Sequence, residues 1–137
     1  MTTPMPYGAP ITLDTAKTVM AAAETEAKKN GWPVVIHIVD SGGNTVMMHR
    51  LDNTQLGSVR VAEGKARTAL DFRRPSKALH DVVSGGGVHM MTLPNVVTIE
   101  GAVPIVSDGK IIGAVGVSGV TSAQDGQVAM AGAAAVK

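Results

Sequence analysis

Basic side chains concentrate in one segment of this chain of 137 residues. Residues 60–77 contain six basic and two acidic residues, whereas the whole chain has a formal net charge of only +1. Such a local excess is typical of a site for a carboxylate or phosphate of modest size, and also of a solvated helix with internal ion pairs. Helical spacing puts Lys65 at the edge of a face of small residues, so we expect it to line a ligand pocket. Arg73 and Arg74 stand where the helix must end, before Pro75, and could converge on an anion there.

Two further side chains are candidates for proton transfer. Glu100 lies in a connection between two expected strands, where burial would raise the pKa of its carboxyl group. His49 is next to Arg50, and Arg50 or Lys65 could hold the carboxylate of a substrate. These residues would suit lyase or isomerase chemistry on a small or aromatic carboxylic acid, without a nucleotide cofactor.

A glycine-rich segment offers a different kind of site. Gly116, Ser118 and Gly119 run from an expected strand into a helix N-terminus, where free backbone N–H groups can bind an anion. The segment lacks the Gly-Lys-Ser/Thr ending of a P-loop. Asp125 follows Ser122 by three residues, as in a variant capping box that would occupy those donors itself.

The histidines form no metal-binding pattern. None is paired with another at a spacing of four residues, so we expect no dedicated metal site. His37 alternates with valines on an expected strand and is predicted to be a hydrogen-bonded core or interface residue. His89, Met90 and Met91 follow three glycines and could offer soft axial ligands to a haem iron, but methionine more often fills gaps in a core, and we expect that role here.

Composition excludes several classes of protein. The absence of cysteine rules out thiolate nucleophiles, CxxC redox chemistry and Fe–S clusters. Three aromatic residues and a near-zero net charge argue against nucleic-acid binding. No apolar run approaches the ~20 residues that span a bilayer, and the first residues lack the pattern of a signal peptide, so we expect a cytoplasmic protein without a membrane partner.

The hydrophobic pattern predicts one α+β domain. Residues 1–11 are rich in proline and are expected to be a flexible arm, and residues 12–137 form the single domain. The apolar spacing predicts helices over 12–30, 55–72, 75–83 and from Thr121 or Ser122 onward, with strands over 34–39, 45–50, 96–99, 102–107 and 110–117. This order lacks a regular βαβ alternation and therefore indicates an antiparallel sheet with helices on one face.

Five motifs, in this order along the chain, resemble those of the GlcG/HbpS family of small haem-binding proteins. They are VIHIVDSGG at 35–43, RLD at 50–52, KARTA at 65–69, GAVPI at 101–105 and IGAVGVSG at 112–119. The resemblance implies a profilin-like or PAS-like α/β fold with a five-stranded antiparallel sheet flanked by helices. It also implies a homo-oligomer based on dimers, such as a hexamer or octamer.

The resemblance implies more than one function. Members of the family are described as binding haem and sensing oxidative stress, a related domain is appended to a cobalamin adenosyltransferase, and others are encoded among genes for acid catabolism. We expect first a basic pocket in which Lys65, Arg73 and Arg74 hold the propionates of haem or a related tetrapyrrole. The alternatives are the enzyme acting on a carboxylic acid and a non-catalytic accessory subunit.

Overall fold

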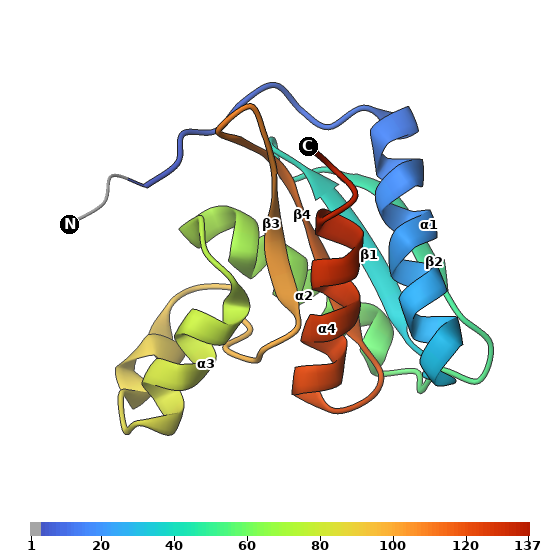
Figure 1. The fold of residues 1–137 in the computed structure, drawn as a ribbon. Coiled ribbons are helices and arrows are strands. Elements are labelled where there is room, and N and C mark those ends of the chain that lie inside the picture. The colour runs from blue at the N-terminus through green and yellow to red at the C-terminus, as the bar shows by residue number, and fades with distance from the viewer. Residues whose placement is uncertain (1–3) are drawn as a thin grey trace.

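A mixed antiparallel sheet-and-helix architecture is confirmed by the computed structural model, which describes residues 4–137 (Figure 1). The elements are α1 (Leu13–Asn30), β1 (Val35–Asp40), β2 (Thr45–Arg50), α2 (Ser58–Phe72), α3 (Ser76–Ser84), the 3-10 helix η1 (Val88–Thr92), β3 (Ala102–Ser107), β4 (Lys110–Ser118) and α4 (Ser122–Ala133). Within residues 4–137, no helix has both the length and the apolar character needed to span a membrane.

The sheet has four strands in the order β2-β1-β4-β3, and every neighbouring pair is antiparallel. The two central strands pair from Val35 opposite Ser118 to Asp40 opposite Gly113. The expected hairpin between β3 and β4 is confirmed, and its two turn residues, Asp108 and Gly109, both have positive φ, as a tight two-residue turn requires.

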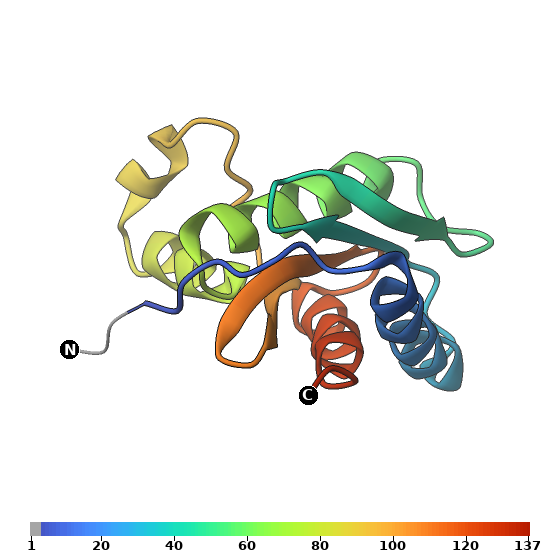
Figure 2. The same cartoon turned by 90° about the horizontal axis from the view of Figure 1, so that it is seen from above.

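Helices cover both faces of the sheet, so the expectation that they lie on one face is wrong. Ile36 and Ile38 of β1 pack with α1 and α4, whereas the neighbouring Val39 packs with α2. Figure 2 shows α2 on one side of the sheet, with α1 and α4 on the other. Because successive side chains of a strand point to opposite faces, a strand that is apolar at consecutive positions must be covered on both sides. The sequence of β1 has this run of consecutive apolar residues.

The expected strand over 96–99 is also wrong, which leaves the described chain with four strands instead of five. The backbone N–H of Val97 donates to Oγ1 of Thr68 at 2.9 Å, and the N–H of Glu100 donates to Nδ1 of His80 at 2.9 Å. Side chains of α2 and α3 therefore take up donors that a strand would give to a neighbouring strand. The segment runs as a loop across the two helices.

Part of the expected flexible arm is hydrogen-bonded to the fold. Residues 1–3 lie outside the described residues. Beyond them, Gly8 N donates to Ile111 O at 2.8 Å, and Ile111 N donates to Pro6 O at 2.9 Å. The hydroxyl of Tyr7 donates to Leu70 O at 2.6 Å, at the C-terminal end of α2. The arm therefore connects β4 to α2.

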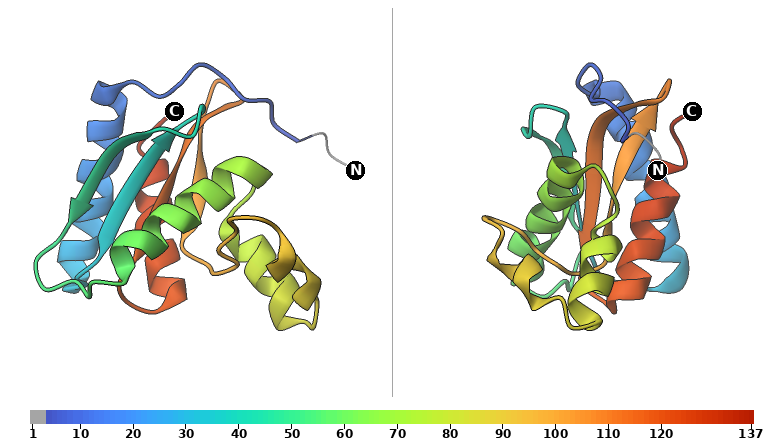
Figure 3. Two further views of the ribbon diagram at one scale, coloured as in Figure 1. Left: turned by 180° about the vertical axis from the view of Figure 1, so that it is seen from behind. Right: turned by 90° about the vertical axis from the view of Figure 1, so that its left-hand side faces the viewer.

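The segment from α3 to η1 projects from the rest of the fold (Figure 3). No residue of η1 is buried, and Met91 is 61% exposed. The expectation that Met90 and Met91 fill a gap in the core is therefore wrong. The sequence before them, from Ser84 to Gly87, carries the chain away from the sheet and leaves the methionines without a core to fill.

Candidate functional site

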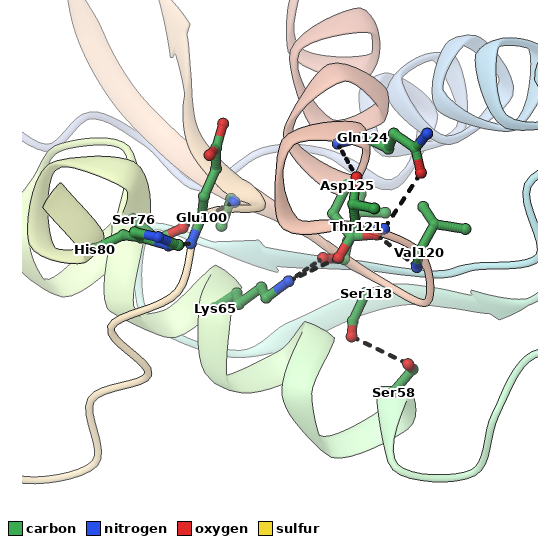
Figure 4. A network of polar contacts seen from close by, with 12 residues as sticks. Ser58, Lys65, Ser76, His80, Glu100, Ser118, Val120, Thr121, Gln124 and Asp125 are labelled. Atoms are coloured by element: carbon green, nitrogen blue, oxygen red, sulfur yellow. Dashed lines mark hydrogen bonds and ion pairs between the residues drawn. The ribbon is translucent and has the colours of Figure 1, made fainter. Parts of the chain in front are cut away.

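Lys65 of α2 is part of an internal ion pair (Figure 4). Its side chain is 2% exposed, and its ammonium donates to Oδ2 of Asp125 at 3.0 Å and to the carbonyl of Val117 at 3.0 Å. Burial raises the pKa of the Asp125 carboxyl group above its ordinary value, and the Lys65 ammonium opposes that shift. Lys65 lines neither of the two cavities described below.

Two glycines leave the space that the Lys65 side chain and helix α2 occupy. A Cβ on Gly101 would lie 2.7 Å from Nζ of Lys65, and the backbone there has a φ of 143°, which side chains rarely adopt. A Cβ on Gly116 would lie 2.6 Å from the backbone nitrogen of Ala66. Gly116, a candidate ligand-binding residue, is thus the point at which α2 packs on β4.

The glycine-rich segment before α4 is also occupied by contacts within the chain. Ser118 is buried and its hydroxyl donates to Oγ of Ser58 at 3.1 Å, while a Cβ on Gly119 would lie 2.8 Å from Cα of Val34. Thr121 and Gln124 form the capping box of α4. The expected partner, Asp125, instead accepts the N–H of Val120 at 3.1 Å. Side chains therefore take donors that an anion would need.

Glu100 lies between α3 and α4, away from the other candidate for proton transfer. Its carboxylate is 3.2 Å from the position that a Cβ of Gly126 would take. His49 is on β2, at the far edge of the sheet, and neither cavity described below is lined by both residues. The structure therefore does not bring the two candidates together.

The larger cavity, of about 700 Å³, is an open cleft at the free edge of β2. His49 and Arg50, both candidates from the sequence, line it. The C-terminal part of α1 contributes Glu24 and Lys28, and the loop that follows contributes Trp32. Its volume is within the range of about 300–1,000 Å³ that is common for small-molecule sites.

The imidazole of His49 is held by a carboxylate. Its Nδ1 makes a short contact with Oε1 of Glu24. A carboxylate only accepts hydrogen bonds, so Nδ1 carries the proton, and in the neutral ring Nε2 keeps its lone pair. Carboxylates orient metal-binding histidines in this way. His49 can therefore offer the lone pair of its Nε2 to a metal.

Around His49 the cleft combines apolar walls with cations. Met48 and Leu51 line it together with Trp32. Lys28 is 3.5 Å from the Glu24 carboxylate, whereas Arg50 has no carboxylate at ion-pair distance among residues 4–137. No group of three or more acidic or histidine side chains in this part of the chain could enclose a metal ion. The cleft can therefore provide one nitrogen ligand, His49 Nε2, to a metal whose other ligands belong to a bound cofactor.

A smaller cavity, of about 300 Å³, lies at the opposite edge of the sheet and is lined by Arg73 and Arg74. The edge strands β2 and β3 are separated by β1 and β4, which corresponds to roughly 14 Å between their axes. The expectation of one basic pocket containing Lys65, Arg73 and Arg74 is therefore wrong, because Lys65 is inside the fold and the arginines flank a separate cavity.

Reasoning from the sequence assigned none of Trp32, Glu24 and Asp125 to the roles that the structure gives them. Trp32 was counted only among the three aromatic residues, and Asp125 only as part of a capping box. Glu24 is 25 residues from His49, and Asp125 is 60 residues from Lys65. Contacts at such separations leave no spacing that a single sequence reveals.

Comparisons with known proteins support one family. Residues 11–134 match the family model described as "Haem degrading protein HbpS-like". Protein GlcG of Escherichia coli strain K12 is 44% identical over 103 residues, which are 75% of this chain and 77% of that protein.

Two solved structures share the fold. A double mutant of Streptomyces reticuli HbpS superposes with a TM-score of 0.86 at 28% identity, covering 97% of this chain and 91% of that one. A structure described as a complex of PduOC with haem superposes with a TM-score of 0.84 at 30% identity, covering 94% of this chain and 96% of that one.

Proposed function

The chain belongs to the HbpS-like family, and from that premise we propose that it binds haem or a related tetrapyrrole in the cleft at the free edge of β2. The observation that carries the proposal is His49, whose ring is oriented by Glu24 and whose Nε2 keeps a lone pair beside a cavity of about 700 Å³. The PduOC complex supports it, since a protein 30% identical to this chain is described there with haem.

The residues of the cleft suit the parts of such a ligand. His49 would supply a nitrogen ligand to the iron. Trp32, Met48 and Leu51 would pack against the apolar macrocycle, and Arg50 would bind a propionate. A bound haem would supply a redox-active iron, while the protein would hold and orient it.

Titration of the purified chain with hemin, followed by the Soret band, tests the proposal. We expect saturable binding at micromolar concentrations, weakened by His49→Ala. Glu24→Gln should weaken it by about tenfold, because the loss of an orienting carboxylate typically costs 10–100-fold in metal affinity. Circular dichroism of both variants checks that the fold is intact.

His89→Ala is the matched control, because His89 is exposed on η1 and is the histidine that the sequence offered as a ligand to a haem iron. If His89→Ala abolishes binding and His49→Ala does not, the ligand binds at the projecting segment and the cleft is the wrong site. If hemin gives no saturable Soret shift, haem binding is refuted.

The assembly of the chain is a separate proposal. We infer a homo-oligomer based on dimers, as the resemblance to the family implies, in the cytoplasm. Native mass spectrometry of untreated protein would count the subunits and reveal any pigment that copurifies. A monomer at micromolar concentration would contradict the oligomer.

A further inference from the structure

The cavity flanked by Arg73 and Arg74 has an apolar lining that comes from the sheet and from the N-terminal arm. Val103 and Val106 of β3 and Ile111 of β4 provide apolar side chains, and Met5 of the N-terminal arm lines it from another side. The arm is fixed there by the hydrogen bonds between residues 6–8 and Ile111. The cavity is therefore a partly open one, lined by parts of the chain that the fold holds together.

The two arginines are cations without an acidic partner. Within residues 4–137, neither guanidinium has a carboxylate at ion-pair distance. Arg73 lies over the ring of Tyr7, 5.7 Å from its centroid, and Nε of Arg74 donates to Phe72 O at 2.9 Å. These contacts orient the side chains and leave their charge uncompensated, as a site for an anion requires.

The backbone at Arg73 makes this residue convenient to substitute. Arg73 is the C-cap of α2 and has a φ of 54°, in the left-handed region. Glycine adopts this conformation at helix ends without steric cost, whereas a residue with a side chain does so at some cost. A glycine could therefore replace Arg73 without strain in the backbone, which makes this position suitable for a test of the side chain.

We propose that this cavity is a second binding site, which takes a small organic monocarboxylate with a compact apolar body. Arg73 and Arg74 would bind the carboxylate, and Val103, Val106 and Ile111 would contact the apolar part. A volume of about 300 Å³ is less than half that of the cleft at β2 and suits a compact molecule. The site is independent of haem binding, because it lies at the other edge of the sheet.

An NMR titration of the full chain with hexanoate tests the site, with hexanol as the uncharged probe of similar shape. We expect saturable shifts of the Val106 and Ile111 amide signals with hexanoate. Hexanol should bind at least tenfold more weakly, since a hydrogen bond to a charged group is worth about 1.5–3 kcal/mol. Equal affinity for the two probes would overturn the assignment, and so would the absence of saturable shifts at these amides.

Variants separate the site from general charge effects. Arg73→Gly and Arg74→Gln should each weaken hexanoate binding about tenfold or more, and Arg73→Gly should not lower the thermal midpoint, because glycine suits the left-handed backbone. Arg60→Ala, an exposed arginine of α2 outside the cavity, should leave binding unchanged. An equal loss with Arg60→Ala, or equal competition by inorganic phosphate, would show an unspecific charge effect and refute the proposal.

Hemin titration of Arg73→Gly keeps this proposal apart from the first one. Unchanged hemin binding with lost hexanoate binding supports two separate sites. Loss of both ligands would show that the arginines serve the tetrapyrrole, which would contradict an independent site.

Discussion

The ammonium of Lys65 has two partners inside the fold, and its side chain is almost fully buried. Asp125 accepts from it through one oxygen and from the Val120 N–H through the other. A buried ion pair adds little net stability compared with well-packed apolar residues, but removal of one partner leaves an uncompensated charge in the interior. The Lys65 ammonium and the Asp125 carboxylate therefore each need the other to remain charged inside the fold.

Lys65→Met should lower the free energy of unfolding by about 3–5 kcal/mol, because it leaves the Asp125 carboxylate unpaired. Adding Asp125→Asn should restore part of this loss, since an amide oxygen can still accept from Val120. Urea unfolding of the single and double variants measures the coupling. Lys110→Met, at an exposed position of β4, is the control and should change stability by less than about 0.5 kcal/mol. Additive effects of the two substitutions would contradict the pairing.

His37 should make the stability of the fold depend on pH. It is 4% exposed, Nε2 contacts Oγ1 of Thr45 at 2.9 Å, and Nδ1 is buried without a hydrogen-bond partner among residues 4–137. Burial lowers the pKa of His37 below its ordinary value of 6.5, Glu63 opposes the shift and Arg67 adds to it. The unfolded chain thus binds a proton near pH 6.5 that the folded chain binds only at lower pH.

The free energy of unfolding should therefore fall as the pH drops below 6.5, with a contribution from His37 of at most about 1.4 kcal/mol per pH unit. Above 6.5 this contribution should be complete and constant. His37→Gln should flatten the dependence in urea unfolding measured from neutral to mildly acidic pH, and His89→Gln, at an exposed position, should not. Parallel curves for His37→Gln and the unaltered chain would sink this explanation.

For single residues, the sequence predicted whether a side chain is buried better than it predicted which residue the side chain contacts. The position of His37 on a buried strand was predicted from its alternation with valines, and Lys65 was correctly placed at the edge of a small-residue face. That face packs against the sheet, and the acid that neutralises Lys65 comes from a helix 60 residues further along the chain. No local pattern shows whether such a lysine faces a ligand or an internal carboxylate.

Among the elements, α2 and β4 approach each other most closely where both carry small residues. Ala62, Ala66 and Ala69 are fully buried on α2, and Gly116 of β4 lies against Ala62 and Ala66. Small residues permit this close approach because there is no side chain to separate the backbones. The contact fixes α2, which carries both Lys65 and, at its end, Arg73.

Gly116→Ala should therefore push α2 away from the sheet. We expect a loss of about 1–3 kcal/mol in the free energy of unfolding, as is usual for overpacking in a core. Gly57→Ala is the matched control, because Gly57 has an ordinary backbone conformation (φ −59°) and no atoms within 4 Å of an added Cβ. It should be neutral or slightly stabilising. Thermal unfolding compares the two, and an equal effect would contradict the close packing.

The helices and hairpins could be predicted from local signals, but the segment over 96–99 could not. Periodicity, capping residues and the Asp108-Gly109 turn act within a few positions, and the structure has the elements that they predict. Residues 96–99 are β-branched, as in a strand, yet the N–H of Val97 donates to the Thr68 side chain of α2, and Glu100, just after the segment, donates its N–H to the His80 side chain of α3. Tertiary partners decided the outcome there, and propensity did not.

In the whole molecule, the two proposed sites lie at opposite edges of the sheet. The cleft with His49 lies along β2, and the cavity with Arg73 lies along β3. The sequence identified residues of both sites, but it assigned Lys65 and the arginines to one pocket. Strand order decides which residues share an edge, and strand order is set by long-range pairing that the hydrophobic pattern does not record.

Because Lys65 is buried, its reaction with a reagent in solution reports how often the interior of the protein opens. Every other lysine in the chain is exposed, so an acylating reagent should modify those amines at once and reach Lys65 only when α2 and α4 separate. The delay before that one amine reacts, read by mass spectrometry of its peptide, would time the opening of the interior.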